Sequence, residues 1–110
     1  MEISEVVNEV GNILKSIGAE RVMVRKEGRC YLLVSKFRND AVLISIRSGE
    51  FFNGFIVKVV PTDKVANIPW ECRYLEYVPY GLYLLVSNVS DLRSRLPDKV
   101  KRVLSVLITR

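Results

Sequence analysis

The fold is decided by residues 21–47, which read RVMVRKEGRCYLLVSKFRNDAVLISIR. Apolar and polar side chains tend to alternate in this stretch, as they do in strands that bury one face. Together with the segment that follows it, the stretch predicts four strands, over residues 22–24, 30–34, 41–47 and 55–60. The links between them, including the turn at Lys26–Arg29 and the polar link at Lys36–Asp40, are too short for crossover helices. Neighbouring strands are therefore expected to be antiparallel.

A helix is predicted on each side of this meander. The first has apolar residues at the spacing of one helix face, and Gly18 follows it as a C-terminal glycine: Ile3, Val6, Val7, Val10, Leu14 and Ile17. The second has an N-cap signal at Ser90-Asp91, and Pro97 is expected to divide it into a short and a longer helix. Its apolar face is formed by Leu92, Leu96, Val100, Val103, Leu104 and Leu107. The β-branched alternation over residues 103–109 leaves a strand there as an alternative.

The segment between the fourth strand and the last helix is less regular. One helical turn is predicted over residues 62–67, with Thr62 as its N-cap. Residues 72–78 and 82–87 are then predicted to form a hairpin about Pro79-Tyr80-Gly81. The chain is thus expected to be one α+β domain over residues 1–110, with a meander of five to six strands and both helices on one face of a single sheet. This order of elements resembles type III secretion chaperone-like folds, but no motif accompanies it, so the resemblance implies no function.

The composition excludes several kinds of chemistry. The 110 residues carry a net charge of +5, contain no histidine and include two cysteines. Without histidine there is no Ser-His-Asp or Cys-His nucleophile, no His-ligated zinc and no histidine switch. Cys30 and Cys72 form no Cys-x-x-Cys motif, so they are either two buried thiols or one disulfide. Glutamine is absent as well, which together with many charges is typical of heat-adapted proteins.

Two remaining catalytic motifs are incomplete. A carboxylate-and-lysine nuclease needs a Glu-x-Lys, but Glu71-Cys72-Arg73 places an arginine where that lysine is required. The glycine spacing of Gly49–Gly54 matches a phosphate loop, yet no Lys-Ser/Thr follows it. We therefore expect no enzymatic activity, no metal and no cofactor. No apolar run approaches the roughly 18 residues of a membrane span, so a cytoplasmic protein without a membrane partner is expected.

Basic residues are concentrated in two parts of the chain. The first includes the predicted turn at Lys26–Arg29, and the second is the last helix, where Arg95, Lys99 and Arg102 recur at helical spacing. Such clusters are typical of solvated surfaces. They can also bind the phosphates of a nucleic acid, because binding releases the counterions that surround those phosphates. Nucleic-acid binding without strong sequence specificity is therefore one hypothesis for function, the alternative to the protein-binding hypothesis given next. The residues expected to serve it are Arg25, Lys26, Arg29, Lys36, Arg38, Arg95, Lys99 and Arg102.

Aromatic residues are concentrated in the predicted late hairpin. In that hairpin Leu75, Tyr77, Leu84 and Val86 form the core side, and the other side is apolar apart from Glu76. A surface of this kind is either covered by the same chain or used to bind a partner. The leading hypothesis is therefore a non-catalytic module that binds protein, either a second copy or a larger assembly. The interface residues it names are Trp70, Tyr74, Val78, Tyr80, Tyr83 and Leu85.

Overall fold

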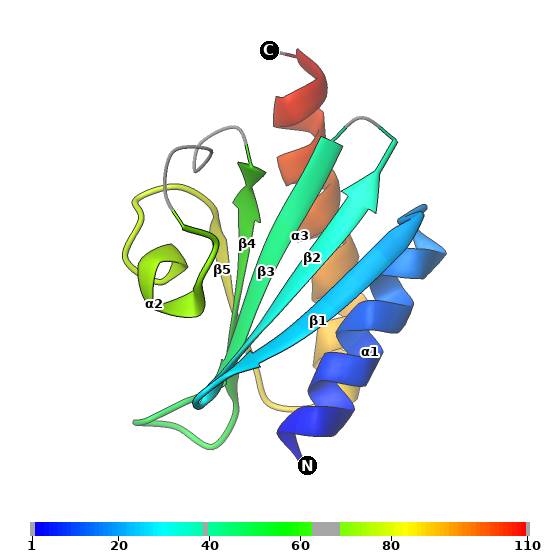
Figure 1. The fold of residues 1–110 in the computed structure, drawn as a ribbon. Helices are drawn as coiled ribbons and strands as arrows, with labels where there is room; N and C mark the ends of the chain where they lie inside the picture. The colour runs from blue at the N-terminus through cyan, green and yellow to red at the C-terminus, as the bar shows by residue number, and fades with distance from the viewer. Residues whose placement is uncertain (1, 39, 63–68, 110) are drawn as a thin grey trace.

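The computed structural model describes residues 2–38, 40–62 and 69–109, with side chains through residue 105. Five antiparallel strands form one sheet in the order β1-β2-β3-β4-β5, so β1 and β5 are its edges. Both long helices cover the same face of this sheet (Figure 1), which confirms the predicted α+β architecture. The elements are α1 (Ile3–Ser16), β1 (Arg21–Glu27), β2 (Cys30–Phe37), β3 (Asp40–Ser48), β4 (Phe55–Pro61), α2 (Cys72–Leu75), β5 (Leu82–Val86) and α3 (Val89–Thr109).

The main core lies between the sheet and the two long helices. The predicted apolar face of α1 is buried there, including Val6, Val10 and Leu14, and Gly18 has the positive φ expected after the helix. Alternate residues of the strands complete this core, because successive side chains of a strand point to opposite faces. Leu33 and Ile44 are examples, and both are fully buried.

The last helix differs from the prediction at its start and in its middle. Asn88 caps α3, since its side-chain oxygen accepts a hydrogen bond from the Asp91 amide at 2.8 Å, so the cap predicted at Ser90-Asp91 is wrong. Pro97 lies inside a single continuous helix, and the strand alternative over residues 103–109 is wrong as well. An interior proline costs about 3 kcal/mol. The apolar stripe on both sides of it is buried on the sheet, and each such side chain contributes about 1.5–3 kcal/mol.

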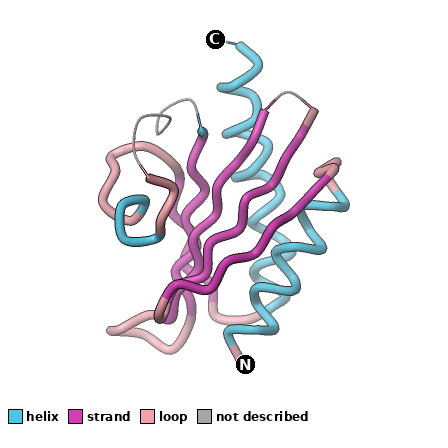
Figure 2. The backbone as a smooth tube through the Cα atoms, viewed as in Figure 1, coloured by secondary structure: helices cyan, strands magenta, loops and turns pink. Residues whose placement is uncertain are grey.

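The predicted late hairpin is wrong, because residues 72–78 form no strand. Cys72–Leu75 is a single helical turn, and β5 pairs with β4 instead. Residues 69–81, here called the strap, run across the outer face of the sheet, the face opposite α1 and α3 (Figure 2). Leu75 of the strap is buried against the sheet, whereas Tyr77, predicted on the core side, is 85% exposed. A short apolar run does not by itself distinguish a strand from a helical turn.

A second, smaller core lies between the strap and the outer face. Cys72 and Leu75 of the strap pack there against Leu32, Leu43 and Val60 of the sheet. At the end of β4, the Thr62 hydroxyl donates a hydrogen bond to the Ala41 carbonyl at 2.9 Å. The helical turn predicted over residues 62–67 otherwise lies outside the described residues. Within the described part of the chain, no helix has the length and apolarity required to cross a membrane.

Candidate functional site

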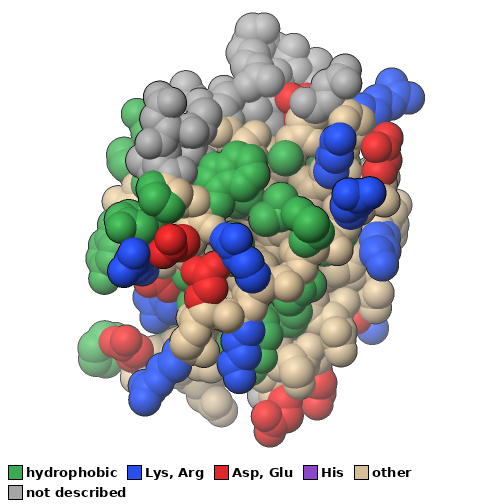
Figure 3. Space-filling view, in the orientation of Figure 1, with side chains coloured by type: hydrophobic (Ala, Val, Ile, Leu, Met, Phe, Trp, Pro, Cys, Tyr) green, Lys and Arg blue, Asp and Glu red, His purple; other side chains and the backbone are tan. Residues whose placement is uncertain are grey.

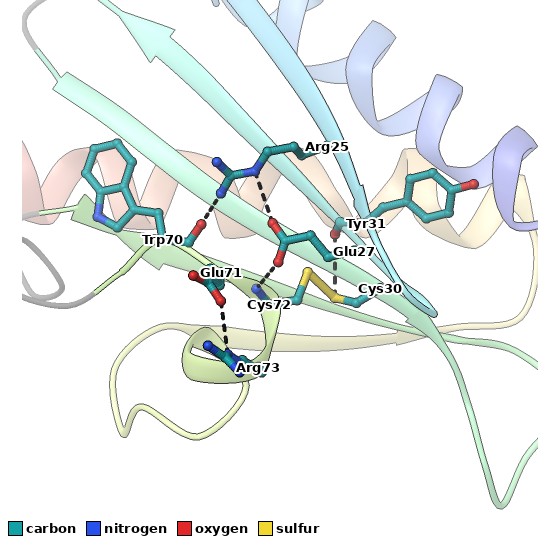
Figure 4. A network of polar contacts seen from close by, with 8 residues as sticks. All are labelled: Arg25, Glu27, Cys30, Tyr31, Trp70, Glu71, Cys72 and Arg73. Carbon is teal, nitrogen blue, oxygen red and sulfur yellow. Dashed lines mark hydrogen bonds and ion pairs between the residues drawn. A yellow bond between two sulfur atoms is a disulfide. The ribbon is translucent and has the colours of Figure 1, made fainter.

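The start of the strap is tied to β1 and β2 by a polar network and a disulfide. Cys72 is bonded to Cys30 of β2, which settles the alternatives for the two cysteines. Glu27 accepts a hydrogen bond from the Cys72 amide at 2.9 Å and is also paired with Arg25 at 3.0 Å. Arg25 in turn donates to the Trp70 carbonyl, and the Trp70 indole points away from the disulfide (Figure 4). These interactions place the strap on the sheet.

The end of the strap is held by a buried lysine. Lys58 lies in the middle of β4 on the outer face and is only 1% exposed. Its Nζ donates to the carbonyls of Leu75 and Val78, both at 2.6 Å, and lies 4.8 Å from the centre of the Tyr83 ring. Burial lowers the pKa of Lys58, because removal from water disfavours the charged ammonium, and the nearby Glu76 carboxylate partly opposes this. Lys58 thus serves as an internal anchor.

A charged hollow of about 740 Å³ opens beside the disulfide. Four arginines and three glutamates line it together with both cysteines. Three of the arginines are already paired with these glutamates, Arg25 with Glu27 (3.0 Å), Arg47 with Glu76 (2.8 Å) and Arg73 with Glu71 (3.0 Å). Because the charges largely cancel within the hollow, it offers little attraction to an anion despite its many arginines.

The residues predicted as an aromatic interface do not belong to one hairpin, because they are divided between the strap and β5. Trp70 lies at the start of the strap, and the Tyr74 ring is stacked beneath the Arg73 guanidinium at 4.8 Å. Val78 packs against the second core. Tyr83 and Leu85, each 52% exposed, lie on the outer face of β5, while Tyr80 is in the connection that leads to β5. The hairpin prediction thus placed on two paired strands residues that belong to the strap and to β5.

The cations predicted to bind nucleic acid are also dispersed. Arg25 is engaged with Glu27, and Arg95 is engaged with Asp91 at 3.1 Å and with the Leu85 carbonyl at 2.7 Å. Lys26 lies 5.9 Å from the Tyr31 ring. Lys99 and Arg102 belong to α3, behind the sheet, whereas Lys36 is on the outer face. Arg29 lines the charged hollow, and Arg38 follows β2. The two predicted clusters therefore do not form one surface.

The two edges of the sheet differ in character. The β1 edge carries Arg21, Arg25 and Lys26, and charged side chains of this kind prevent edge-to-edge pairing. The β5 edge reads LYLLV and carries no charged residue. A single polar contact reaches it from α3, where Arg95 donates to the Leu85 carbonyl, as far as the described residues record. An uncharged, partly exposed edge strand is a template for pairing with another strand.

Two features of the structure were not predicted from the sequence. Lys58 interrupts the apolar run of β4, and a lone cation within such a run was the available signal for a buried anchor. Tyr77 lies beside Tyr83 and lines with it a small hollow of about 80 Å³ above Lys58. No sequence signal identified this pair, because Tyr77 was assigned to the opposite side of a hairpin that does not form.

Comparison with protein-family models, curated proteins and solved structures finds no match to this chain. Among the described residues there is also no group of three or more His, Cys, Asp or Glu side chains that could hold a metal ion. Function must therefore be inferred from the surfaces of this molecule alone.

Proposed function

We propose that this protein is a non-catalytic binding module that associates with a second copy of itself through β5. The observation that carries the proposal is the contrast between the two edges of one sheet. β1 has three cations along its length, while β5 has only apolar residues and tyrosine. An edge strand without charged side chains of its own favours strand pairing, and a second strand would share or displace the contact of Arg95 with the Leu85 carbonyl.

The sequence of β5 suits antiparallel pairing with itself. A two-fold axis at Leu84 sets Tyr83 opposite the partner's Leu85 on the outer face, and this pair occurs twice. On the helix face the same axis sets Leu82 opposite the partner's Val86. Aromatic and aliphatic cross-strand pairs each contribute about 0.2–1 kcal/mol, and no like charges face one another in this register. The pairing joins two five-stranded sheets into one continuous sheet.

The exposed side chains beside β5 extend the proposed interface. Tyr83 and Leu85 are both half exposed on the outer face, and Tyr77 next to Tyr83 is 85% exposed. Tyrosines are favoured at protein interfaces because they combine a large apolar ring with a polar hydroxyl. The Tyr83 hydroxyl is already used, since it donates to the Glu76 carbonyl at 2.7 Å, and its ring is thereby held in place.

Sedimentation velocity over a range of concentrations tests the proposal. The wild-type protein should sediment as twice its 12.6 kDa mass. Leu85→Lys places a charge on the β5 edge, as β1 has, and should weaken dimerisation by about tenfold, because it disrupts both of the Tyr83–Leu85 cross-strand pairs.

Val24→Lys is the matched control. Val24 lies on the other edge strand, β1, and at 53% is exposed to the same extent as Leu85 at 52%. This variant should remain dimeric, and circular dichroism should show both variants folded. A wild-type protein that stays monomeric up to about 1 mM, or equal dissociation by both variants, would refute the proposal.

A further inference from the structure

A second surface with a different character lies at the other side of the outer face. A hollow of about 310 Å³ is formed there by β1, β2, the start of β3 and the start of the strap. Met23, Val34 and Ala41 make it apolar, and Trp70 borders it. Met23 is 54% exposed and Trp70 is 36% exposed, so both are accessible to a ligand. In the space-filling view of this face, basic side chains border apolar ones (Figure 3).

Two cations of this hollow are placed directly opposite each other. Arg21 of β1 and Lys36 of β2 are cross-strand partners, and both line the hollow on the outer face. Like charges in this position are destabilising. Within the described part of the chain, no ion pair includes Arg21 or Lys36. Asp40 also lines the hollow, so the two cations there outnumber one carboxylate. A bound anion would relieve this repulsion.

The turn after β2 adds a third cation at the same end of the sheet. Arg38 is exposed, and its backbone has a φ of 49°, the only positive φ of a non-glycine residue in the described chain. This conformation is unfavourable for residues with a Cβ atom, and a turn at this place is ordinarily occupied by glycine or asparagine. Arg38 thus adds a positive charge to the end of the sheet at which Arg21 and Lys36 are cross-strand partners.

We propose that this hollow binds single-stranded nucleic acid. The apolar floor and the Trp70 indole match the flat face of a base, because bases stack on aromatic side chains with little sequence preference. Arg21 and Lys36 in the hollow, with Arg38 in the turn that follows β2, supply positive charge for the phosphates on either side of that base. The volume is near the lower end for ligand sites, which fits one nucleotide of a strand rather than a duplex groove. This proposal is independent of association through β5.

The intrinsic fluorescence of Trp70 reports directly on the site, because Trp70 is the single tryptophan of the chain. A single-stranded oligothymidylate of about 12 nucleotides, within the usual site size, should quench it at low salt. Anisotropy of the labelled oligonucleotide then measures affinity. Trp70→Ala should weaken binding by about tenfold because the base no longer stacks on the indole, whereas Trp70→Phe should restore most of the affinity.

Two charge variants test the interaction with phosphates. Lys36→Glu should weaken binding and reduce the slope of log affinity against log salt by about 0.7 for each phosphate that is no longer neutralised. Lys15→Glu makes the same change in net charge at an exposed position of α1, behind the sheet, and should have a much smaller effect. Tyr77→Ala is the aromatic control for Trp70→Ala, since Tyr77 is exposed but lies beside Tyr83.

Three results would overturn the proposal. One is the absence of quenching and of binding at low salt. Another is an equal effect of Lys36→Glu and Lys15→Glu, which would reduce the attraction to net charge alone. The third is equal quenching by a polyglutamate peptide, which would assign the hollow to an acidic protein partner. Circular dichroism of each variant separates a defect in binding from a defect in folding.

Discussion

Reduction of the disulfide between Cys30 and Cys72 should lower the free energy of unfolding by about 4 kcal/mol. The two cysteines are 42 residues apart, and the entropy of closing a loop of this length gives that value at room temperature. The disulfide and four hydrogen bonds that involve Glu27, Arg25 and Lys58 hold the strap on the sheet. The folded structure should therefore persist after reduction, and most of the effect should come from the unfolded chain.

Guanidinium denaturation with and without dithiothreitol measures this difference. A slope of about 4 kcal/mol per molar guanidinium corresponds to a midpoint shift of about 1 M. Far-ultraviolet circular dichroism follows the whole fold, while Trp70 fluorescence follows the strap. The Cys30→Ala/Cys72→Ala variant is the control and should not respond to dithiothreitol. A shift below about 0.3 M would contradict the loop-closure reasoning.

Three further predictions concern single side chains. Lys58→Met should destabilise the fold by about 2 kcal/mol, because two carbonyls lose their donor. The pKa of Lys58 is lowered from 10.5 in the folded protein, so the unfolded chain binds this proton more tightly. The difference in unfolding free energy between wild type and variant should therefore grow as pH rises toward 10.5. Asn88→Ala should cost about 1 kcal/mol by removing the cap of α3, and a cost near zero in thermal denaturation would contradict that assignment. Arg93 donates to Glu9 at 2.6 Å and lowers the pKa of that carboxyl below 4.5. This pair should stabilise the fold above pH 4.5, an effect that disappears as pH falls through the lowered pKa. In Arg93→Ala, carboxyl NMR should find the pKa of Glu9 back near its ordinary value, and an unchanged titration would exclude the pair as the cause.

Elements with long or unambiguous periodicity could be predicted from the sequence without any knowledge of the fold. The apolar stripe from Ile3 to Ile17 specifies α1, and Gly18 ends it with a positive φ. The alternation and short links of residues 21–47 specify antiparallel neighbours, since two strands joined by a short turn have no other way to pair. The contrast between a charged first edge and an apolar fifth strand was also present in the sequence, but it acquires meaning only when the strand order is known.

Long-range packing resolved what local patterns left open. Residues 72–78 form a short, largely apolar run that is also typical of a strand. Because β5 already occupies the edge of β4, the segment instead buries Cys72 and Leu75 by crossing the outer face. Pro97 remains within a helix because the apolar stripe of α3 is buried on both sides of it. The pairing of Cys30 with Cys72 depends on where the strap crosses the sheet, and the opposition of Arg21 and Lys36 depends on the register of β1 and β2. Propensity acts over a few residues, whereas register and burial depend on segments that are distant in sequence and meet only in the folded chain.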